Sequence, residues 1–180
     1  MKTEKEELAW LAGAWDGEGS ISIFPRFERY RYRNGEKEIE KNPFRKLTAT
    51  LTLVNTEQSF MAEAIRILDK HGIAVWVQER KLNKRNKNHS DCWQLVCRKL
   101  EAIKKFLELI FPYLISKKPQ ADLVLRFVNS RLEQLSKRKN GLGYTEEEQS
   151  LEQQIRILNK RGQNESSTTI RQTPKGEDIV

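Results

Sequence analysis

The clearest pattern in the chain is the strict alternation of polar and apolar residues in KLTATLTLV, residues 46–54. Successive side chains of a strand point to opposite faces, so this segment has one polar and one apolar face. It predicts a half-buried strand over residues 45–54 of an antiparallel sheet. The Ser/Ile alternation after Gly19 predicts a partner strand over residues 20–33. The connection, residues 34–43, is rich in turn formers, and Asn34-Gly35 is its strongest turn signal.

Helical spacing of apolar residues marks most of the remaining elements. Thr3 and Glu6 form a candidate capping box that opens a helix ending at about Trp15. A second helix covers residues 57–71, and a third begins at about residue 100 and ends at the sequence SKKP, residues 116–119. Pro119 suits the first turn of a fourth helix. A fifth follows the break at residues 140–143 and is capped by Thr145.

Two further strands fall between the second and third helices, in IAVWVQERKL and DCWQLVCRK. The order is therefore α-β-β-α-β-β-α followed by two helices. It predicts an α+β fold with a four-stranded antiparallel sheet covered by helices on one face. We expect a single domain over residues 1–162. Residues 163–180 contain only three aliphatic residues, which predicts a flexible C-terminal tail.

Charge narrows the choice of partner. There are 33 basic and 25 acidic residues, which gives a net charge of +8. This excess favours a polyanion, first a nucleic acid and second an anionic membrane surface. The apolar runs are too short to span a bilayer, and MKTEKEELAW does not resemble a signal peptide. Two cysteines without a secretion signal indicate a reducing interior, so we expect an intracellular protein, in the cytoplasm of a prokaryote or in an organelle.

The polar face of the predicted sheet is a candidate surface for reading DNA. A two-stranded ribbon fits the major groove, where polar side chains contact base edges, while Lys and Arg contact phosphates. A solvated face with no partner has the same composition, and this alternative stays open. The candidate DNA-binding residues are Ser22, Phe24, Arg26, Glu28, Tyr30, Tyr32, Lys46, Thr48, Thr50, Gln78, Arg80, Lys81, Lys84, Arg85, Asp91, Trp93, Lys118, Lys137 and Lys139.

The segment LAGAWDGEG, residues 11–19, combines small residues with two acids. Ala9, Gly13 and Gly17 recur every four residues, which lets two helix backbones approach closely. The glycines could also simply end the helix. Neither explanation accounts for Glu18, because a carboxylate is unfavourable at the negative end of the helix dipole. A bound cation would reverse that sign, and carboxylate, carbonyl and water oxygens are the ligands that Mg²⁺ prefers.

This segment resembles the motif of the LAGLIDADG homing endonucleases. Five residues match the motif outright, Glu18 replaces its second Asp, and Gly17 replaces its second Ala. Downstream, FPYLISKKPQADLV is similar to a helix, basic turn and helix of the family, which places Lys117 where the active-site lysine is found. Asn55 falls at the family's polar residue near the metal-bound water. The resemblance covers about residues 7–160; the five matching residues are Leu11, Ala12, Gly13, Asp16 and Gly19.

The resemblance implies a homodimer, because the motif occurs once and two copies pack their motif helices together above the DNA. Ala9, Ala12, Gly13 and Asp16 would then lie at the dimer interface, with Asp16 mainly structural at the helix end. Trp15 is unusually bulky for a residue near that interface. No small-molecule cofactor and no membrane partner are implied.

The resemblance also implies roles at the site. Glu18 and the Gly17 carbonyl would bind Mg²⁺ or another divalent cation such as Mn²⁺, while Ca²⁺ could bind without supporting cleavage. Lys117 would offset charge on the phosphate or polarise the attacking water, and Asn55 would orient solvent. Two plainer roles remain open: Lys117 as a cation at a helix end, and Asn55 as the N-cap of the following helix.

The function that follows is a site-specific double-strand DNA endonuclease, hydrolysing phosphodiesters at a long, near-palindromic target. It would be encoded by a mobile intron or an independent reading frame. An alternative is a non-cleaving binder of the same fold, such as an intron RNA maturase. A third is a basic α+β protein whose partner is another protein.

Overall fold

The structure is a computed structural model, and it describes residues 2–33, 36–81, 91–137 and 143–164; the side chains of residues 27–45 and 161–164 are not described. The elements in chain order are α1 (Glu4–Glu18), β1 (Gly19–Arg33), β2 (Glu36–Asn55), α2 (Gln58–Lys70), β3 (Trp76–Arg80), β4 (Cys92–Cys97), α3 (Leu100–Ile110), the short 3-10 helix η1 (Phe111–Tyr113), α4 (Lys118–Lys137) and α5 (Glu146–Asn164). The predicted α+β order is confirmed.

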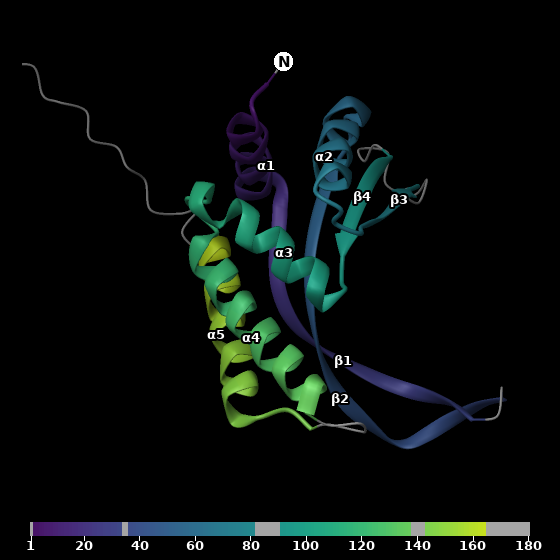
Figure 1. Ribbon diagram of the computed structural model, residues 1–180. Helices are drawn as coiled ribbons and strands as arrows, with labels where there is room; N and C mark the ends of the chain where they lie inside the picture. Colours follow the sequence, from purple (N-terminus) through teal and green to yellow (C-terminus); the bar gives the residue numbers. More distant parts are fainter. Residues whose placement is uncertain (1, 34–35, 82–90, 138–142, 165–180) are drawn as a thin grey trace, which may run out of the picture.

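The four strands form one antiparallel sheet in the order β1-β2-β4-β3. The alternation read from the sequence fixes its faces as predicted. Ile21 and Ile23 of β1 are buried, as are the alternate residues of β2. These side chains join one hydrophobic core with the helices, and α4 and α5 lie side by side along the β1–β2 hairpin (Figure 1). The buried residues of β2 on this face are Leu47, Ala49, Leu51 and Leu53.

The first hairpin is longer than predicted. β2 begins at Glu36 rather than at residue 45, so the expected loop over residues 34–43 is wrong except at residues 34–35, which lie outside the described residues. Cross-strand pairing outweighs the turn-forming composition, because Arg33 lies opposite Glu36 and Arg31 opposite Glu38. The register shifts between Glu28 and Tyr30. The hairpin runs out past the helices (Figure 1).

Helix α1 begins as predicted and ends later. Thr3 is its N-cap, and the capping box with Glu6 is present. The helix continues one turn past Trp15, to Glu18. Trp15 is fully buried in its own chain and meets Phe106 edge-on, with ring centroids 4.6 Å apart. The bulk of Trp15 therefore fills the core, and the expectation that it lies near an interface between helices of two chains is wrong.

Gly19 shows why this arrangement needs a glycine. A Cβ at Gly19 would lie 2.5 Å from Cδ1 and 2.8 Å from Cα of Trp15. Its φ of −84° is open to any residue, so the requirement is space and not backbone conformation. The first strand can therefore leave the helix against the face of the indole ring only because position 19 has no side chain.

Helix α5 and the residue two positions before it bind the long hairpin through polar contacts. The Tyr144 hydroxyl donates to the Leu47 carbonyl at 3.1 Å, and Asn159 Nδ2 donates to the Ile21 carbonyl at 3.4 Å. Thr145 and Glu148 cap α5 reciprocally, as predicted. The helix runs to Asn164, past the expected boundary at 162, and residues 165–180 lie outside the described residues. Among the described helices, none has the length and apolar character needed to cross a membrane.

Candidate metal and nucleic-acid site

The site is built where the end of α1 meets the start of α4. The Asp16 carboxylate accepts three hydrogen bonds from the turn before α4: from Ile115 N at 2.7 Å, Lys117 N at 2.8 Å and Ser116 Oγ at 3.0 Å. Burial acts to raise the pKa of Asp16, but these hydrogen bonds outweigh it, so the pKa lies below its ordinary value. Asp16 therefore joins two segments about one hundred positions apart in the sequence.

The Lys117 side chain also binds Asp16. Its ammonium group donates to the backbone carbonyl of Asp16, close to the last turn of α1. Burial lowers the pKa of Lys117, while the charges of Asp16 and Glu18 act in the opposite direction. A lysine that is partly removed from water and faces two carboxylates is more than a solvated cation at a helix end. Lys117 is thus held at the end of α1, where the charge of Glu18 acts on it.

Glu18 is exposed as the last residue of α1. The Gly17 carbonyl beside it has no partner within the helix, because the last carbonyls of an α-helix lack one. Each chain therefore presents a carboxylate and a carbonyl oxygen, the donor types that fit Mg²⁺ with water completing its shell. The described residues contain no cluster of three or more His, Cys, Asp and Glu side chains suited to a metal.

Asn55 ends β2 next to this point. Gly19 pairs with Leu53, so β2 extends two residues further, alongside the end of α1. The Asn55 side chain accepts from Glu57 N at 2.8 Å, which closes the turn before α2. The N-cap of α2 is Glu57, whose carboxylate accepts from Ser59 N, so the N-cap role considered for Asn55 is wrong.

An open stripe follows one side of α1. Ala9, Gly13 and Gly17 are exposed, and a Cβ added at Gly13 or Gly17 would meet nothing within 4 Å. Ala12 is fully buried in the core of its own chain, about 100° around the helix from Gly13, so its expected place at a dimer interface is wrong. Asp16 is likewise bound to its own α4 segment.

Over the residues whose side chains are described, the free face of the first hairpin holds the residues expected there. Ser22 and Thr48 are half-buried, and Arg26 and Lys46 are exposed. Phe24 is 38% exposed. Thr50 shares this face but is only 4% exposed, because its short side chain sits on a central strand, so the expectation that it contacts DNA is wrong. Glu28, Tyr30 and Tyr32 lie on β1, and their side chains are outside the description.

The second hairpin corrects one face assignment. Gln78 pairs with Gln94, and their side chains share a hydrogen bond of 2.7 Å on the free face. Trp93 lies next to Gln94 in β4, so its side chain is on the opposite face of the sheet, with Leu95. It packs against the core. Its expected contact with DNA is therefore wrong. The sequence reading missed Trp76, which is 56% exposed opposite Val96; the alternation of Val75 and Val77 around it was the available signal.

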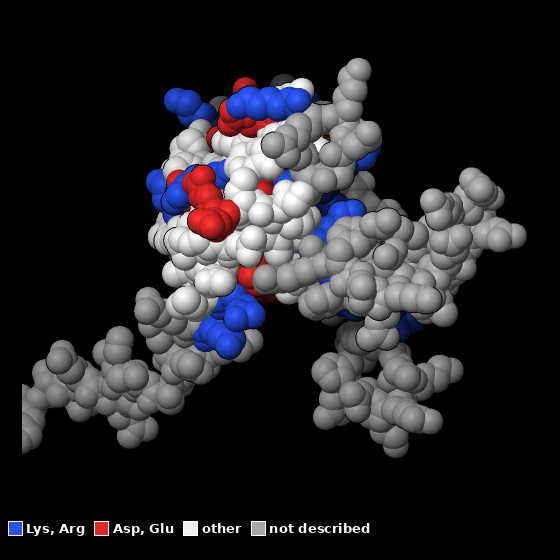
Figure 2. Space-filling model, turned by 90° about the horizontal axis from the view of Figure 1, so that it is seen from below, with Lys and Arg blue, Asp and Glu red and all other residues white. Residues whose placement is uncertain are grey.

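The remaining candidates are basic or acidic residues near strand and helix ends. Arg80, Lys81 and Asp91 are exposed beside the second hairpin. Lys118 lies over the Phe111 ring at 5.1 Å, and Lys137 pairs with Glu133. Seen from below, Lys and Arg form separate groups around a mostly uncharged centre (Figure 2). Lys84, Arg85 and Lys139 lie outside the described residues.

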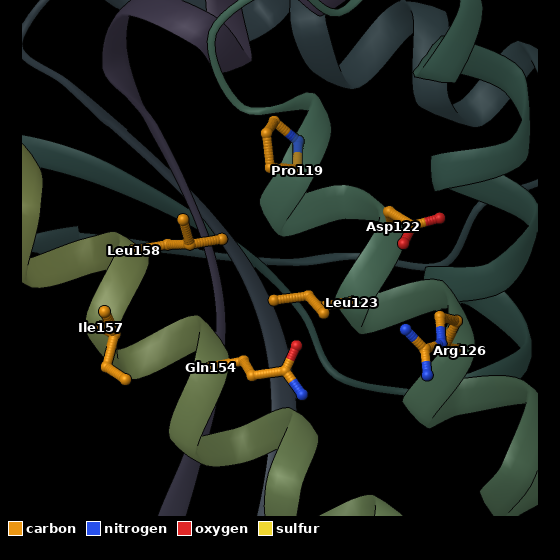
Figure 3. A pocket seen from close by; sticks show the side chains of 7 residues that line it. All are labelled: Pro119, Asp122, Leu123, Arg126, Gln154, Ile157 and Leu158. Atoms are coloured by element: carbon orange, nitrogen blue, oxygen red, sulfur yellow. The ribbon is translucent and has the colours of Figure 1, made fainter.

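A groove of about 410 Å³ lies between α4 and α5, where Leu123 and Leu158 point toward one another (Figure 3). It contains none of the predicted site residues. Its remaining walls are Pro119, Asp122, Arg126, Gln154 and Ile157.

Cys92 and Cys97 are both free thiols. Burial raises the pKa of Cys97 to about 12, which makes this thiol a core residue and not a reactive group.

Comparison with solved structures identifies the fold. The homing endonuclease I-CvuI, crystallised with the I-CreI target and Mg, is 18% identical, with a TM-score of 0.54 over 94% of this chain and 87% of that chain. The archaeal intron-encoded homing endonuclease I-Vdi141I, complexed with DNA, is 15% identical, with a TM-score of 0.51 over 87% and 99% of the two chains. At these identities the likeness shows a shared fold.

The group I intron-encoded homing endonuclease I-CeuI, complexed with DNA, is 9% identical, with a TM-score of 0.54 over 76% of this chain and 60% of that chain. No curated protein sequence matches this chain. Residues 5–110, more than half of the chain, match the LAGLIDADG-like domain, a range that includes Glu18 and Asn55 but not Lys117. The chain belongs to the LAGLIDADG-like domain family.

Proposed function

We propose that the protein is a site-specific, divalent-metal-dependent endonuclease that cuts double-stranded DNA as a homodimer. The observation that carries the proposal is the convergence of Glu18, Asn55 and Lys117 at the end of α1. These residues come from three different elements, and Glu18 is exposed there. A protein that only bound nucleic acid would have no chemical need for this set.

The open stripe on α1 supports a second copy of the chain. Without side chains at Gly13 and Gly17, two α1 helices can approach closely about a two-fold axis. That packing brings the two Glu18 carboxylates together at one end of the helix pair. A symmetric dimer reads a near-palindromic target, with one free sheet face on each half-site.

Glu18 and the Gly17 carbonyl would hold Mg²⁺ or Mn²⁺. Such an ion supplies an activated water and offsets negative charge on the phosphate. Lys117 stabilises the negative charge that develops at the phosphate, because its ammonium group is already held and partly desolvated. Asn55, rigid in its turn, orients solvent. The free thiols of Cys92 and Cys97 fit a reducing compartment, as in a prokaryotic cytoplasm or an organelle.

The test is selection from a randomised duplex library with Mg²⁺, followed by sequencing of the cut ends. We expect double-strand breaks at one long, near-palindromic sequence. Glu18→Gln should abolish cleavage and keep DNA binding, whereas Glu4→Gln, an exposed acid at the other end of α1, should cut at the parental rate. Cleavage by Glu18→Gln at the parental rate would overturn the assignment of the metal site.

The maturase alternative predicts that the protein promotes splicing of an intron RNA and cuts no duplex. The protein-partner alternative predicts affinity for duplex DNA that does not fall with added salt, because no counterions are then released from phosphates.

A further inference from the structure

A row of residues crosses the free face of the sheet from the candidate site to the sheet edge. Ser20 pairs with Thr52, Thr52 with Val96, and Val96 with Trp76. All four share one face, opposite to the core-facing Leu95 and Val77. The row starts two residues after Glu18 and ends on β3, the edge strand. Anything that lies across this face from Glu18 therefore reaches Trp76.

The far end of this row is apolar. Val96 is 3% exposed yet lies outside the main core, because it points to the free face. Trp76 is 56% exposed at its side. Together with Ala74 and Val75 they border a hollow of about 290 Å³. The exposed indole of Trp76 leaves a large apolar area in contact with water. The fold does not require an apolar residue on this face, because the next pair along it is Gln78 and Gln94.

Two cations complete the walls of this hollow. Arg98 and Lys99 follow β4 directly, are exposed, and contribute to its lining. The cavity thus combines an apolar floor with a basic rim. A purely apolar partner would gain nothing from that rim, whereas a partner with an apolar group beside negative charges would match both parts.

We infer that this hollow receives the C5-methyl group of a thymine in the major groove, while Arg98 and Lys99 contact the neighbouring phosphates. The inference rests on the proposed function, which places DNA on this face. In the major groove the base edges present donors and acceptors, and the thymine methyl is the apolar group among them. Basic side chains at the rim contact phosphates and set the register. Trp76 is thus a residue that determines specificity.

The experiment uses the full chain with Ca²⁺ and the selected target. Each thymine is replaced in turn by deoxyuridine, which removes only the methyl group. At one position of each half-site we expect affinity to fall about three- to fivefold, the effect of losing one buried methyl group. Replacement in both half-sites should multiply the two losses to about tenfold or more. This series needs no protein variant, so misfolding cannot obscure it.

The Trp76→Ala variant then tests whether Trp76 contacts the methyl group that deoxyuridine lacks. The variant should bind the thymine target as weakly as the parent binds the uridine target, and uridine should cost it nothing further. Gln78→Ala, a change next along the same face, should keep the uridine effect. Arg98→Ala and Lys99→Ala should each reduce the slope of log affinity against log salt by about one, and Lys105→Ala, on α3, should not.

Two results would overturn the inference and leave the proposed function intact. One is parental affinity, within twofold, for every uridine-substituted target. The other is an unchanged uridine effect in Trp76→Ala. A chain that binds and cuts no duplex at any salt concentration would remove the proposed function, and the inference with it.

Discussion

Asp16 and Glu18 are acids two positions apart in one nine-residue motif, and they sit in opposite environments. The Asp16 carboxylate is half-buried and accepts hydrogen bonds from three consecutive residues, 115–117. The Glu18 carboxylate is exposed at the end of the same helix. Two positions on a helix differ by about 200° around its axis, so neighbouring acids necessarily face different partners.

This difference in environment indicates different roles for the two acids. Asp16 fixes the α1–α4 junction, whose geometry decides where Lys117 is held. No described residue hydrogen-bonds to the exposed Glu18 carboxylate, which the proposed function assigns to a cation. One short motif thus contains an acid that holds two segments together and an exposed acid to which the proposed function gives the metal, and hydrogen bonding distinguishes them.

Among variants that keep Glu18, the largest effect should come from Lys117→Met, which removes the ammonium group bound to the Asp16 carbonyl and keeps most of the side-chain volume. We expect the cleavage rate to fall about 100-fold, the usual loss for a group that stabilises charge in the transition state. DNA affinity should change little. Single-turnover cleavage measures the rate. Lys105→Met, an exposed lysine on α3, is the control; equal losses in the two variants would show that Lys117 acts only through general charge.

Gly19→Ala should displace the neighbouring Glu18 and leave the hydrogen bonds of Asp16 in place. Its methyl group would overlap Trp15, including the backbone, so we expect a loss of about 2–3 kcal/mol in the free energy of unfolding. Gly17→Ala meets open space and should gain up to about 1 kcal/mol from helix propensity. Urea unfolding at equal protein concentration compares them. If both variants were equally stable, the close approach of Gly19 to Trp15 would have no energetic weight.

Asp16→Ala removes the fixed acid and should cost about 1–2 kcal/mol, as the loss of a capping side chain does. The folded pKa of Asp16 is below its unfolded value, so its contribution is present above the unfolded pKa, near 4. It is lost as pH falls through the lower folded pKa. Parental stability should therefore decline as the pH falls below about 4, and the decline should be smaller in the variant. Asp122→Ala, an exposed acid on α4, should keep the parental pH dependence.

The smallest effect is expected in the open stripe, on the same helix as Glu18. Gly13→Ala adds a methyl group that meets nothing in its own chain, so the monomer should fold normally. In a dimer the two methyl groups would separate the α1 helices, and we expect about fivefold weaker dimerisation by sedimentation equilibrium. Gly143→Ala, also in open space but before α5, should dimerise like the parent. Equal dimerisation of both variants would place the interface elsewhere.

Much of the fold could be predicted because its strands alternate cleanly and its helices carry local caps. Thr3 with Glu6 and Thr145 with Glu148 mark helix starts within four residues of sequence. The extension of β2 to Glu36 could not be read in this way, because it depends on pairing with β1 and not on its own turn-rich composition.

The candidate site, too, could be predicted from local sequence only in part. Glu18, Lys117 and Asn55 could be predicted from resemblance, but the hydrogen bonds of Asp16 join residues about one hundred positions apart and have no local signal. Trp93 was assigned to the wrong face because neither phase of β4 is clearly apolar, and its register with β2 decides. Ala12 shows that a small residue in a motif can serve its own core.

The junction of Asp16 with residues 115–117 also has a consequence during protein synthesis. The ribosome releases the motif helix long before the segment that fastens it, since about one hundred residues separate the two. A nascent chain therefore carries Glu18 without a positioned Lys117 until α4 has emerged. Under the proposed function, a truncated translation product contains the signature motif but lacks the positioned lysine that cleavage uses.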